Sequence, residues 1–257
     1  MEQFIIALIA AFASLLTFFS GFGLGTILTP VLILFFPVEV AIALTGVVHL
    51  LNNLFKVSLT YKSINRHIAL RFGITAIIGA FAGAKLLAMI SGNDVLFQYQ
   101  WNDHLFTVTL VKLIIAVLMI VFALFESIPS LRNIQFDKNK LPVGGLISGF
   151  FGGLSGNQGA LRSMFLIRAG LGKESFIATG ILIAVAVDIT RLSIYYERFL
   201  GANLTENLSL LVTTTLAAFL GAYLGSRLLK KVTIHFVQNF VTVMIIILAI
   251  ALGLGLI

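Results

Sequence analysis

Long apolar runs recur from one end of this chain to the other and constrain its fold more than any other feature. Ten segments are mostly apolar: 3–20, 24–36, 38–60, 68–90, 105–125, 141–154, 158–169, 174–196, 206–229 and 236–257. A run of about 20 apolar residues crosses a hydrocarbon core about 30 Å thick. The chain is 59% hydrophobic and 11% charged, whereas soluble domains carry about 25% charged residues. The sequence therefore predicts an all-α polytopic membrane protein.

Several function classes lack the residues that they need. The chain has no cysteine, which excludes disulfides, thiolate metal sites and cysteine nucleophiles. HExxH, P-loop and Cys/His metal spacings are also missing from the sequence. We therefore predict no metal, no cofactor and no enzymatic activity. The net charge of +7 fits cytoplasmic loops of a membrane protein better than a nucleic-acid partner.

Lysine and arginine gather in alternate connecting segments. Residues 1–55 and 91–104 contain neither residue, whereas three other segments are basic. The basic residues are Lys56, Lys62, Arg66 and Arg71, then Arg132, Lys138 and Lys140, then Arg227, Lys230 and Lys231. Because cytoplasmic loops are enriched in lysine and arginine, these segments are predicted inside and both termini outside.

Three of the apolar segments, 24–36, 141–154 and 158–169, are too short for each to cross a membrane alone. At about 1.5 Å per residue, a 13-residue helix reaches only about 20 Å. The orientation requires 1–36 to begin and end outside and 141–169 to begin and end inside. Each is predicted to be a re-entrant helix pair or two thin spans, broken at "SGFGLG" (20–25) and "GGLSGNQG" (152–159).

The two halves of the chain share short patterns in the same order. "ALTG" (43–46) corresponds to "IATG" (177–180), and "GAFAGAKLL" (79–87) to "GAYLGSRLL" (221–229). We predict one membrane transport domain, 1–257, made of two inverted-topology repeats, 1–126 and 141–257, joined by a cytoplasmic linker, 127–140. Each repeat is a broken helix pair followed by three long transmembrane helices. The alternative is that the glycine motifs only pack helices together.

Inverted repeats with glycine-interrupted segments are typical of secondary transporters, whose site lies where the broken helices meet. At this point the chain resembles the sulfite exporter (TauE/SafE) family. The resemblance rests on "SGFGLGTILTPVLILFFP", on "GGLISGFFGGLSGNQGALRSMFLIRAGLGKESFIATG" and on the two "GAxxG(A/S)(K/R)LL" segments. It implies export or uptake of small sulfur oxyanions and organosulfonates. The second glycine cluster, "SGNQGALRS", is more polar than the family's usual pattern.

The two glycine breaks supply the candidate anion site. Backbone N–H groups at the start of a half-helix favour anions, and Arg162 adds a planar, permanently charged fork. The candidate residues here are Gly23, Gly25, Thr26, Ser155, Asn157, Gln158, Gly159 and Arg162. The alternatives for Arg162 are an ion pair with Asp188, or a side chain that snorkels to the inner face.

Two long helices add polar groups to this site. Segment 38–60 carries Thr45, His49, Asn52 and Lys56 on one stripe, spaced four, three and four apart, with Asn53 expected to face partly away. The stripe lines an aqueous path or makes interhelical hydrogen bonds. Segment 174–196 carries Asp188 and Arg191. These form an i, i+3 ion pair, or Asp188 carries a proton, as His49 could, and Arg191 contacts the anion.

The sequence thus predicts a secondary transporter of small sulfur-containing anions in the plasma (inner) membrane. Export by alternating access is preferred. A proton-coupled importer of organic anions, with Asp188 or His49 titrating, and an anion channel are the alternatives. The expected partners are a small anionic substrate, the lipid bilayer and, for the importer, protons. The exact anion, the coupling ion and assembly as a homo-oligomer are left open.

Overall fold

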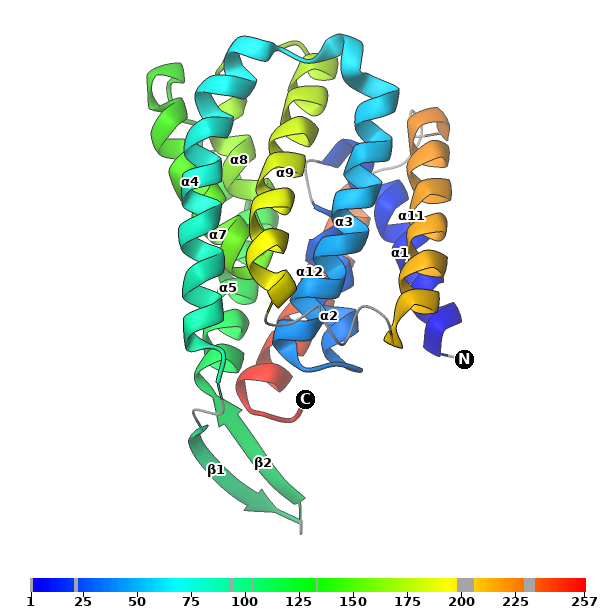
Figure 1. Cartoon of the computed structure of the whole chain (residues 1–257), viewed down its shortest axis with the longest axis vertical. Helices are drawn as coiled ribbons and strands as arrows, with labels where there is room; N and C mark the ends of the chain where they lie inside the picture. The colour runs from blue at the N-terminus through cyan, green and yellow to red at the C-terminus, as the bar shows by residue number, and fades with distance from the viewer. Residues whose placement is uncertain are drawn as a thin grey trace.

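A computed structural model describes residues 2–20, 23–92, 95–102, 104–132, 134–197, 206–228 and 234–257. The helices stand side by side as a bundle, and a hairpin of two strands projects from one end (Figure 1). The first half contains α1 (Glu2–Ser20), α2 (Leu24–Ile33), α3 (Val38–Thr60), a 3₁₀ turn (Tyr61–Ser63), α4 (Arg66–Ile90), β1 (Val95–Trp101), β2 (His104–Thr109) and α5 (Leu110–Ser127). It is followed by α6 (Pro129–Arg132), a 3₁₀ turn (Lys138–Lys140), α7 (Leu141–Ser155), α8 (Gly159–Leu166), α9 (Lys173–Tyr195), α11 (Leu208–Leu228) and α12 (Ile234–Gly253).

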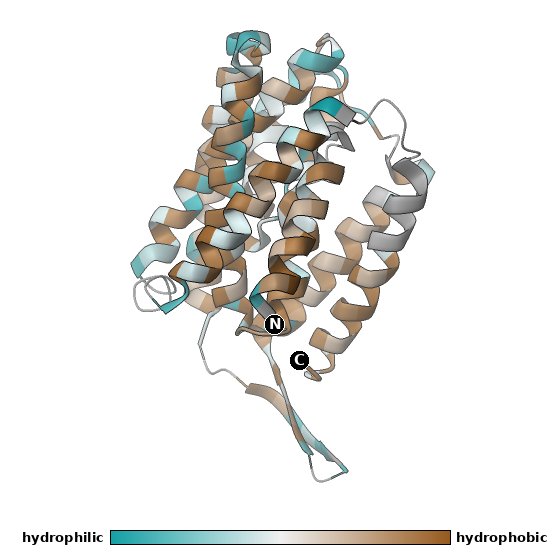
Figure 2. Cartoon of the chain, turned by 90° about the vertical axis from the view of Figure 1, so that its right-hand side faces the viewer, coloured by the Kyte–Doolittle hydropathy of each residue, from teal (hydrophilic) through white to brown (hydrophobic). Residues whose placement is uncertain are grey.

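Four of the described helical segments are long and apolar enough to cross a membrane: Val38–Ser63, Arg66–Ile90, Lys173–Tyr195 and Leu208–Arg227. Shorter apolar stretches lie in α1, α2, α5 and α12. The middle parts of the helices are mostly hydrophobic, and hydrophilic residues gather near their ends (Figure 2). Many large apolar side chains also lie on the outer surface, Phe4, Leu70 and Leu220 among them. These features fit a polytopic helical membrane protein.

The prediction of an all-α chain is wrong at the β1–β2 hairpin. Residues 105–109, predicted as the start of a helix, lie in β2. This strand pairs antiparallel with β1, so that Trp101 lies opposite His104 next to the turn and Val95 lies opposite Thr109 at the other end. β2 has the sequence "HLFTVT", whose β-branched and aromatic residues favour a strand. Helix α5 begins only where the Thr109 side chain caps it by accepting from Lys112 N. The Tyr99 hydroxyl donates to the Leu254 carbonyl at 2.7 Å, tying the hairpin to the end of the chain.

Both ends of the chain lie at the end of the bundle from which the hairpin projects (Figure 1). The turn between α3 and α4 lies at the opposite end (Figure 1). Of the basic residues used to predict orientation, Lys230 and Lys231 lie outside the described residues. The termini and the basic residues Lys62, in this turn, and Arg66, at the start of α4, therefore lie at opposite ends of the bundle.

Helices α7 and α8 form a short hairpin, and α7 packs against α4. Helix α7 ends at Gly156, whose φ of +81° is a left-handed conformation that glycine adopts without strain. Helix α8 then runs back toward the segment before α7. Phe136 N donates to the Met164 carbonyl at 3.0 Å, and Arg168 Nε donates to Gln135 Oε1 at 2.9 Å. The chain thus comes back to the segment from which α7 starts. In the first break, residues 21 and 22 lie outside the described residues.

Glycines let the short helices pack closely against long ones. An added Cβ at Gly79 or Gly83 of α4 would collide with the carbonyl of Leu146 or Phe150 in α7. An added Cβ at Gly221 of α11 would likewise collide with a carbonyl of α1. The interpretation of the "GAFAG" and "GAYLG" motifs as helix-packing motifs is thus confirmed at these three glycines. Each contact joins a helix of one half of the chain to a helix of the other.

Candidate functional site

The two glycine breaks approach each other in the middle of the bundle. A Cβ added to Gly25, at the start of α2, would lie 3.7 Å from the Gly156 carbonyl oxygen at the end of α7. A Cβ added to Gly23 would lie 3.4 Å from His49 Nε2. A Cβ on Gly156 would come within 2.7 Å of Arg191 Nη1. Glycine at these positions therefore lets side chains of α3 and α9 reach the breaks.

Asp188 is the centre of a buried polar network. Its Oδ1 lies 2.8 Å from Arg191 Nη2 and accepts from Arg191 Nε at 3.0 Å. Its Oδ2 lies 2.6 Å from His49 Nδ1 and accepts from Asn53 Nδ2 at 3.3 Å. Asp188 is fully buried and Arg191 is 1% exposed. The network joins α3 to α9, and it contains the i, i+3 ion pair that the sequence offered as one interpretation.

Asn52 on α3 forms a second group of buried polar contacts. With its amide oriented so that the oxygen faces the donors, it accepts from Lys56 Nζ at 3.3 Å and from Ser14 Oγ at 3.0 Å. The amide nitrogen then donates to the Ala218 carbonyl at 3.2 Å. Asn52 therefore joins α3 to α1 and α11, which is the interhelical hydrogen bonding that was the alternative for this stripe.

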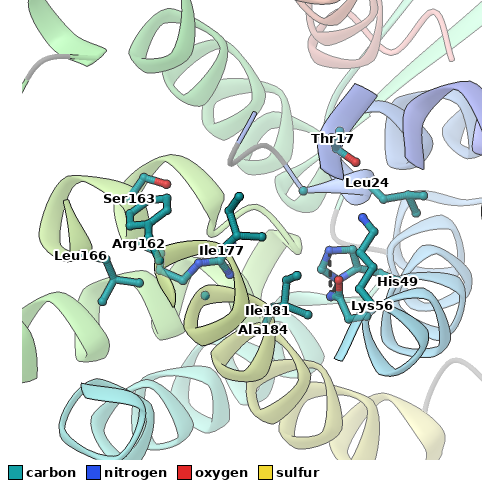
Figure 3. Close-up of a pocket in the computed structure, with 14 residues that line it drawn as sticks. Thr17, Leu24, His49, Lys56, Arg162, Ser163, Leu166, Ile177, Ile181 and Ala184 are labelled. Carbon is teal, nitrogen blue, oxygen red and sulfur yellow. Dashed lines mark hydrogen bonds between the residues drawn. The ribbon is translucent and has the colours of Figure 1, made fainter. Parts of the chain in front are cut away.

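A cavity lies beside this network and is lined mainly by α3, α8 and α9. It encloses about 520 Å³ of empty space, including its opening. Its polar lining includes His49, Asn53, Lys56, Arg162 and Ser163. Figure 3 shows Arg162 on one side of the cavity and His49 and Lys56 on the other, with apolar residues of α9 beside them. Cationic and apolar groups thus share one small space.

Arg162 reaches this cavity from α8. Its guanidinium lies against Gly180 of α9, where an added Cβ would be 3.3 Å from Nε. Its Nη1 is buried and has no hydrogen-bond partner among the residues that the structure describes. None of the ion pairs found there joins it to Asp188, whose oxygens are taken by His49, Asn53 and Arg191. A direct Arg162–Asp188 pair, one alternative for this arginine, is therefore not formed.

The charges around the cavity do not balance. Within the described ranges, Asp188 is the only buried carboxylate. Two arginines lie near it: Arg191, which is buried and paired with it, and Arg162, which lines the cavity with its Nη1 buried. Burying charge without a counter-charge is costly. The excess of positive charge makes this space suited to a small anion, whose oxygens can accept hydrogen bonds from an arginine fork.

The structure distributes the predicted site residues between this cavity and its surroundings. Gly23, His49 and Arg162 line the cavity. The others are buried but do not line it: Gly25, Thr26, Asn52, Ser155, Asn157, Gln158, Gly159 and Arg191. The hydroxyl of Ser155 bonds its own helix at the Phe151 carbonyl. Within the part of the chain that is described, no cluster of three or more His, Asp or Glu residues could hold a metal ion.

Some residues that line the cavity were not in the predicted set. Asn53, expected to face partly away, lies in the lining, as do Ser163 and Gly180. Lys56, which belongs to the stripe predicted on segment 38–60, also lines the cavity. The spacing of His49, Asn53 and Lys56 places them on one face of a helix, so a second stripe was readable. Nothing in the sequence indicates that Gly180 lies beside Arg162.

Comparison with known proteins supports the family resemblance inferred from the glycine motifs. A family model described as sulfite exporter TauE/SafE matches residues 6–252. The chain belongs to the TauE/SafE family. The resemblance first seen in the glycine motifs is thereby confirmed. A search of curated proteins and a search of solved structures each found no match.

Membership of the TauE/SafE family has direct consequences for function. The protein is a membrane transporter of the sulfite or sulfonate type, it works in a lipid bilayer, and its substrate is a small anion. The family is one of transporters rather than enzymes. The buried excess of positive charge beside the breaks is consistent with such a substrate.

Proposed function

We propose that this TauE/SafE protein is a secondary carrier of sulfite or a small organosulfonate and that it binds the anion in the cavity beside Arg162. One observation carries the proposal: a single buried carboxylate lies near two arginines in the described structure, and the Nη1 of one of them, Arg162, has no hydrogen-bond partner there. A bound anion would restore the charge balance. Arginine donates two parallel hydrogen bonds to oxygens in a plane, which suits a sulfite or sulfonate group.

Alternating access between two inverted repeats is the proposed mechanism. Corresponding contacts recur in the two halves: α4 packs against α7, and α1 against α11. The matched glycines Gly46 and Gly180 each lie 3.3 Å, measured from an added Cβ, from an arginine: Arg191 for the first and Arg162 for the second. Such correspondence supports a repeat with a shared central site.

The position of the cavity supports one accessible state. On α9 its lining runs from Phe176 to Ala184, the part of the helix nearer the turn between α3 and α4. Beyond Ala184 the helix carries Asp188 and Arg191, which are buried in the polar network. The Tyr195 hydroxyl donates to the Gly153 carbonyl farther along. We propose that this is the inward-facing state, with the outward path closed by these contacts.

Export is the proposed direction. A membrane potential that is negative inside favours the exit of anions by about 2.3 kcal/mol per charge per 100 mV. A carrier that releases sulfite therefore needs no coupling ion for net efflux.

Proton-coupled import is a second candidate, favoured by the contact between His49 and Asp188. His49 lines the cavity, and its Nδ1 lies 2.6 Å from Asp188 Oδ2. An imidazole ring can accept or donate a proton, so proton transfer at His49 would alter this network as the anion binds. The anion channel remains the third candidate, and no contact favours it.

A ligand screen tests the proposal. Purified protein in detergent is heated with sulfite, sulfate, taurine, an aromatic sulfonate or a short carboxylate. A specific ligand stabilises the folded state by mass action. We expect sulfite or a sulfonate to raise the unfolding midpoint of the wild type in a saturable manner. No shift with any sulfur oxyanion, or an equal shift with every anion, would contradict the proposed site.

A further inference from the structure

An apolar groove lies between α4 and α9, which stand side by side (Figure 1). The groove contains about 870 Å³ of empty space, including its opening. It opens on the outer surface of the bundle, since Leu70, Ile74 and Ile189 in its lining are 62%, 57% and 55% exposed. Apart from Arg66, every residue that lines it is apolar or glycine.

Gly73 shows that protein atoms do not fill this groove. The residue is buried, yet a Cβ added to it would meet nothing within 4 Å. Gly79, six residues along the same helix, is pressed against a carbonyl of α7. Protein interiors are close-packed, and a depression this size on a membrane-facing surface is filled by the surrounding apolar solvent. In a bilayer that solvent is an acyl chain.

Arg66 gives one end of the groove a positive charge. It is exposed and is the first residue of α4, a helix of 25 residues. The N-terminus of a helix carries about half a positive charge, which adds to that of the guanidinium. This end of α4 adjoins the turn that contains Lys62. A turn between two helices long enough to cross a membrane lies at the level of the phospholipid headgroups. The groove continues along α4 past Gly73 to Ile77. At 1.5 Å per residue, Ile77 lies about 16 Å from Arg66 along the helix.

We infer that this groove binds one anionic phospholipid, with an acyl chain lying over Gly73 and the headgroup phosphate at Arg66. The groove supplies the apolar contact and the arginine selects the charge. The inference concerns a lipid site on the outer surface and is independent of the anion cavity.

The test measures unfolding midpoints of detergent-purified protein titrated with dioleoyl phosphatidylglycerol or dioleoyl phosphatidylcholine. Phosphatidylglycerol should raise the wild-type midpoint at lower concentration than phosphatidylcholine, and glycerol phosphate without acyl chains should have no effect. Gly73→Leu fills the groove from α4 and should abolish the shift. Arg66→Gln should weaken phosphatidylglycerol about fivefold, since a basic residue near a membrane surface contributes about 1 kcal/mol, and should leave phosphatidylcholine unchanged.

Two further variants guard against misfolding. Ala186→Leu fills the same groove from α9 and replaces Gly73→Leu if that variant has a low midpoint without lipid. Ile78→Leu, an exposed position on α4 outside the groove, should respond as the wild type does. A wild-type lipid response in the filled variants would overturn the site. Equal affinity for both lipids, unchanged in Arg66→Gln, would overturn the role of the charge.

Discussion

Replacing Arg162 and Arg191 with glutamine, one at a time, should give opposite results although both arginines lie near the centre of the bundle. Arg191 is 1% exposed and makes contacts of 2.8 and 3.0 Å with Asp188. Arg162 makes no ion pair among the described residues, and its buried Nη1 has no partner. Only Arg191→Gln leaves a buried charge, that of Asp188, without its arginine partner.

The magnitudes follow from these contacts. Removing one partner of a buried ion pair costs about 3–5 kcal/mol, which lowers the unfolding midpoint by about 6–20 °C at 2–4 °C per kcal/mol. Arg191→Gln should show this loss, and adding Asp188→Asn should recover most of it. Arg162→Gln should unfold at the wild-type midpoint or above. A charge-assisted hydrogen bond contributes about 1.5–3 kcal/mol. The Arg162→Gln variant should therefore bind sulfite about ten- to a hundredfold more weakly than the wild type.

The assay is thermal unfolding in detergent with and without sulfite, on protein that elutes as a single species. Arg162→Lys keeps the charge but not the fork, so it should recover only part of the affinity. The reasoning fails if Arg162→Gln lowers the midpoint as far as Arg191→Gln does. It fails equally if Arg162→Gln keeps wild-type affinity.

Three other predictions concern packing, orientation and coupling. Gly83→Leu, whose Cβ would collide with α7, should abolish recovery of folded protein. Gly92→Leu, whose Cβ would meet nothing within 4 Å, should match the wild type in yield and midpoint. A cysteine at Asn102, in the turn between β1 and β2, should react with a membrane-impermeant thiol reagent added to intact cells, and one at Ser63, in the turn between α3 and α4, should react only after the cells are opened. The reverse pattern would invert the proposed orientation. If protons are coupled, His49→Gln should abolish pH-driven accumulation in vesicles and retain anion exchange, and unchanged accumulation would remove His49 from coupling.

The long apolar runs made most of the helices predictable. Their length places the four long helices. The glycine-rich break between α7 and α8 falls at Gly156, whose left-handed conformation glycine adopts without strain. The hairpin was missed because "HLFTVT" continues an apolar run without a break. Periodicity does not separate a short apolar strand from the start of a helix.

The candidate site was predictable only in part. Arg162 stands out in the sequence as a charge beside a glycine break, and Asp188 with Arg191 stands out by spacing. The contact between His49 and Asp188 joins residues 139 apart, which no local pattern reports. The same holds for Gly180 and Arg162, where the space for the guanidinium depends on how α8 packs on α9.

We propose that this TauE/SafE protein carries a sulfur oxyanion through the cavity at Arg162. The most direct measurement is exchange of radiolabelled sulfite in proteoliposomes loaded with unlabelled sulfite, comparing wild type with Arg162→Gln. We predict rapid, saturable exchange by the wild type and a half-saturating concentration at least tenfold higher in the variant. Flux that rises linearly with concentration and follows the membrane potential, or exchange that is the same in both proteins, would contradict the claim.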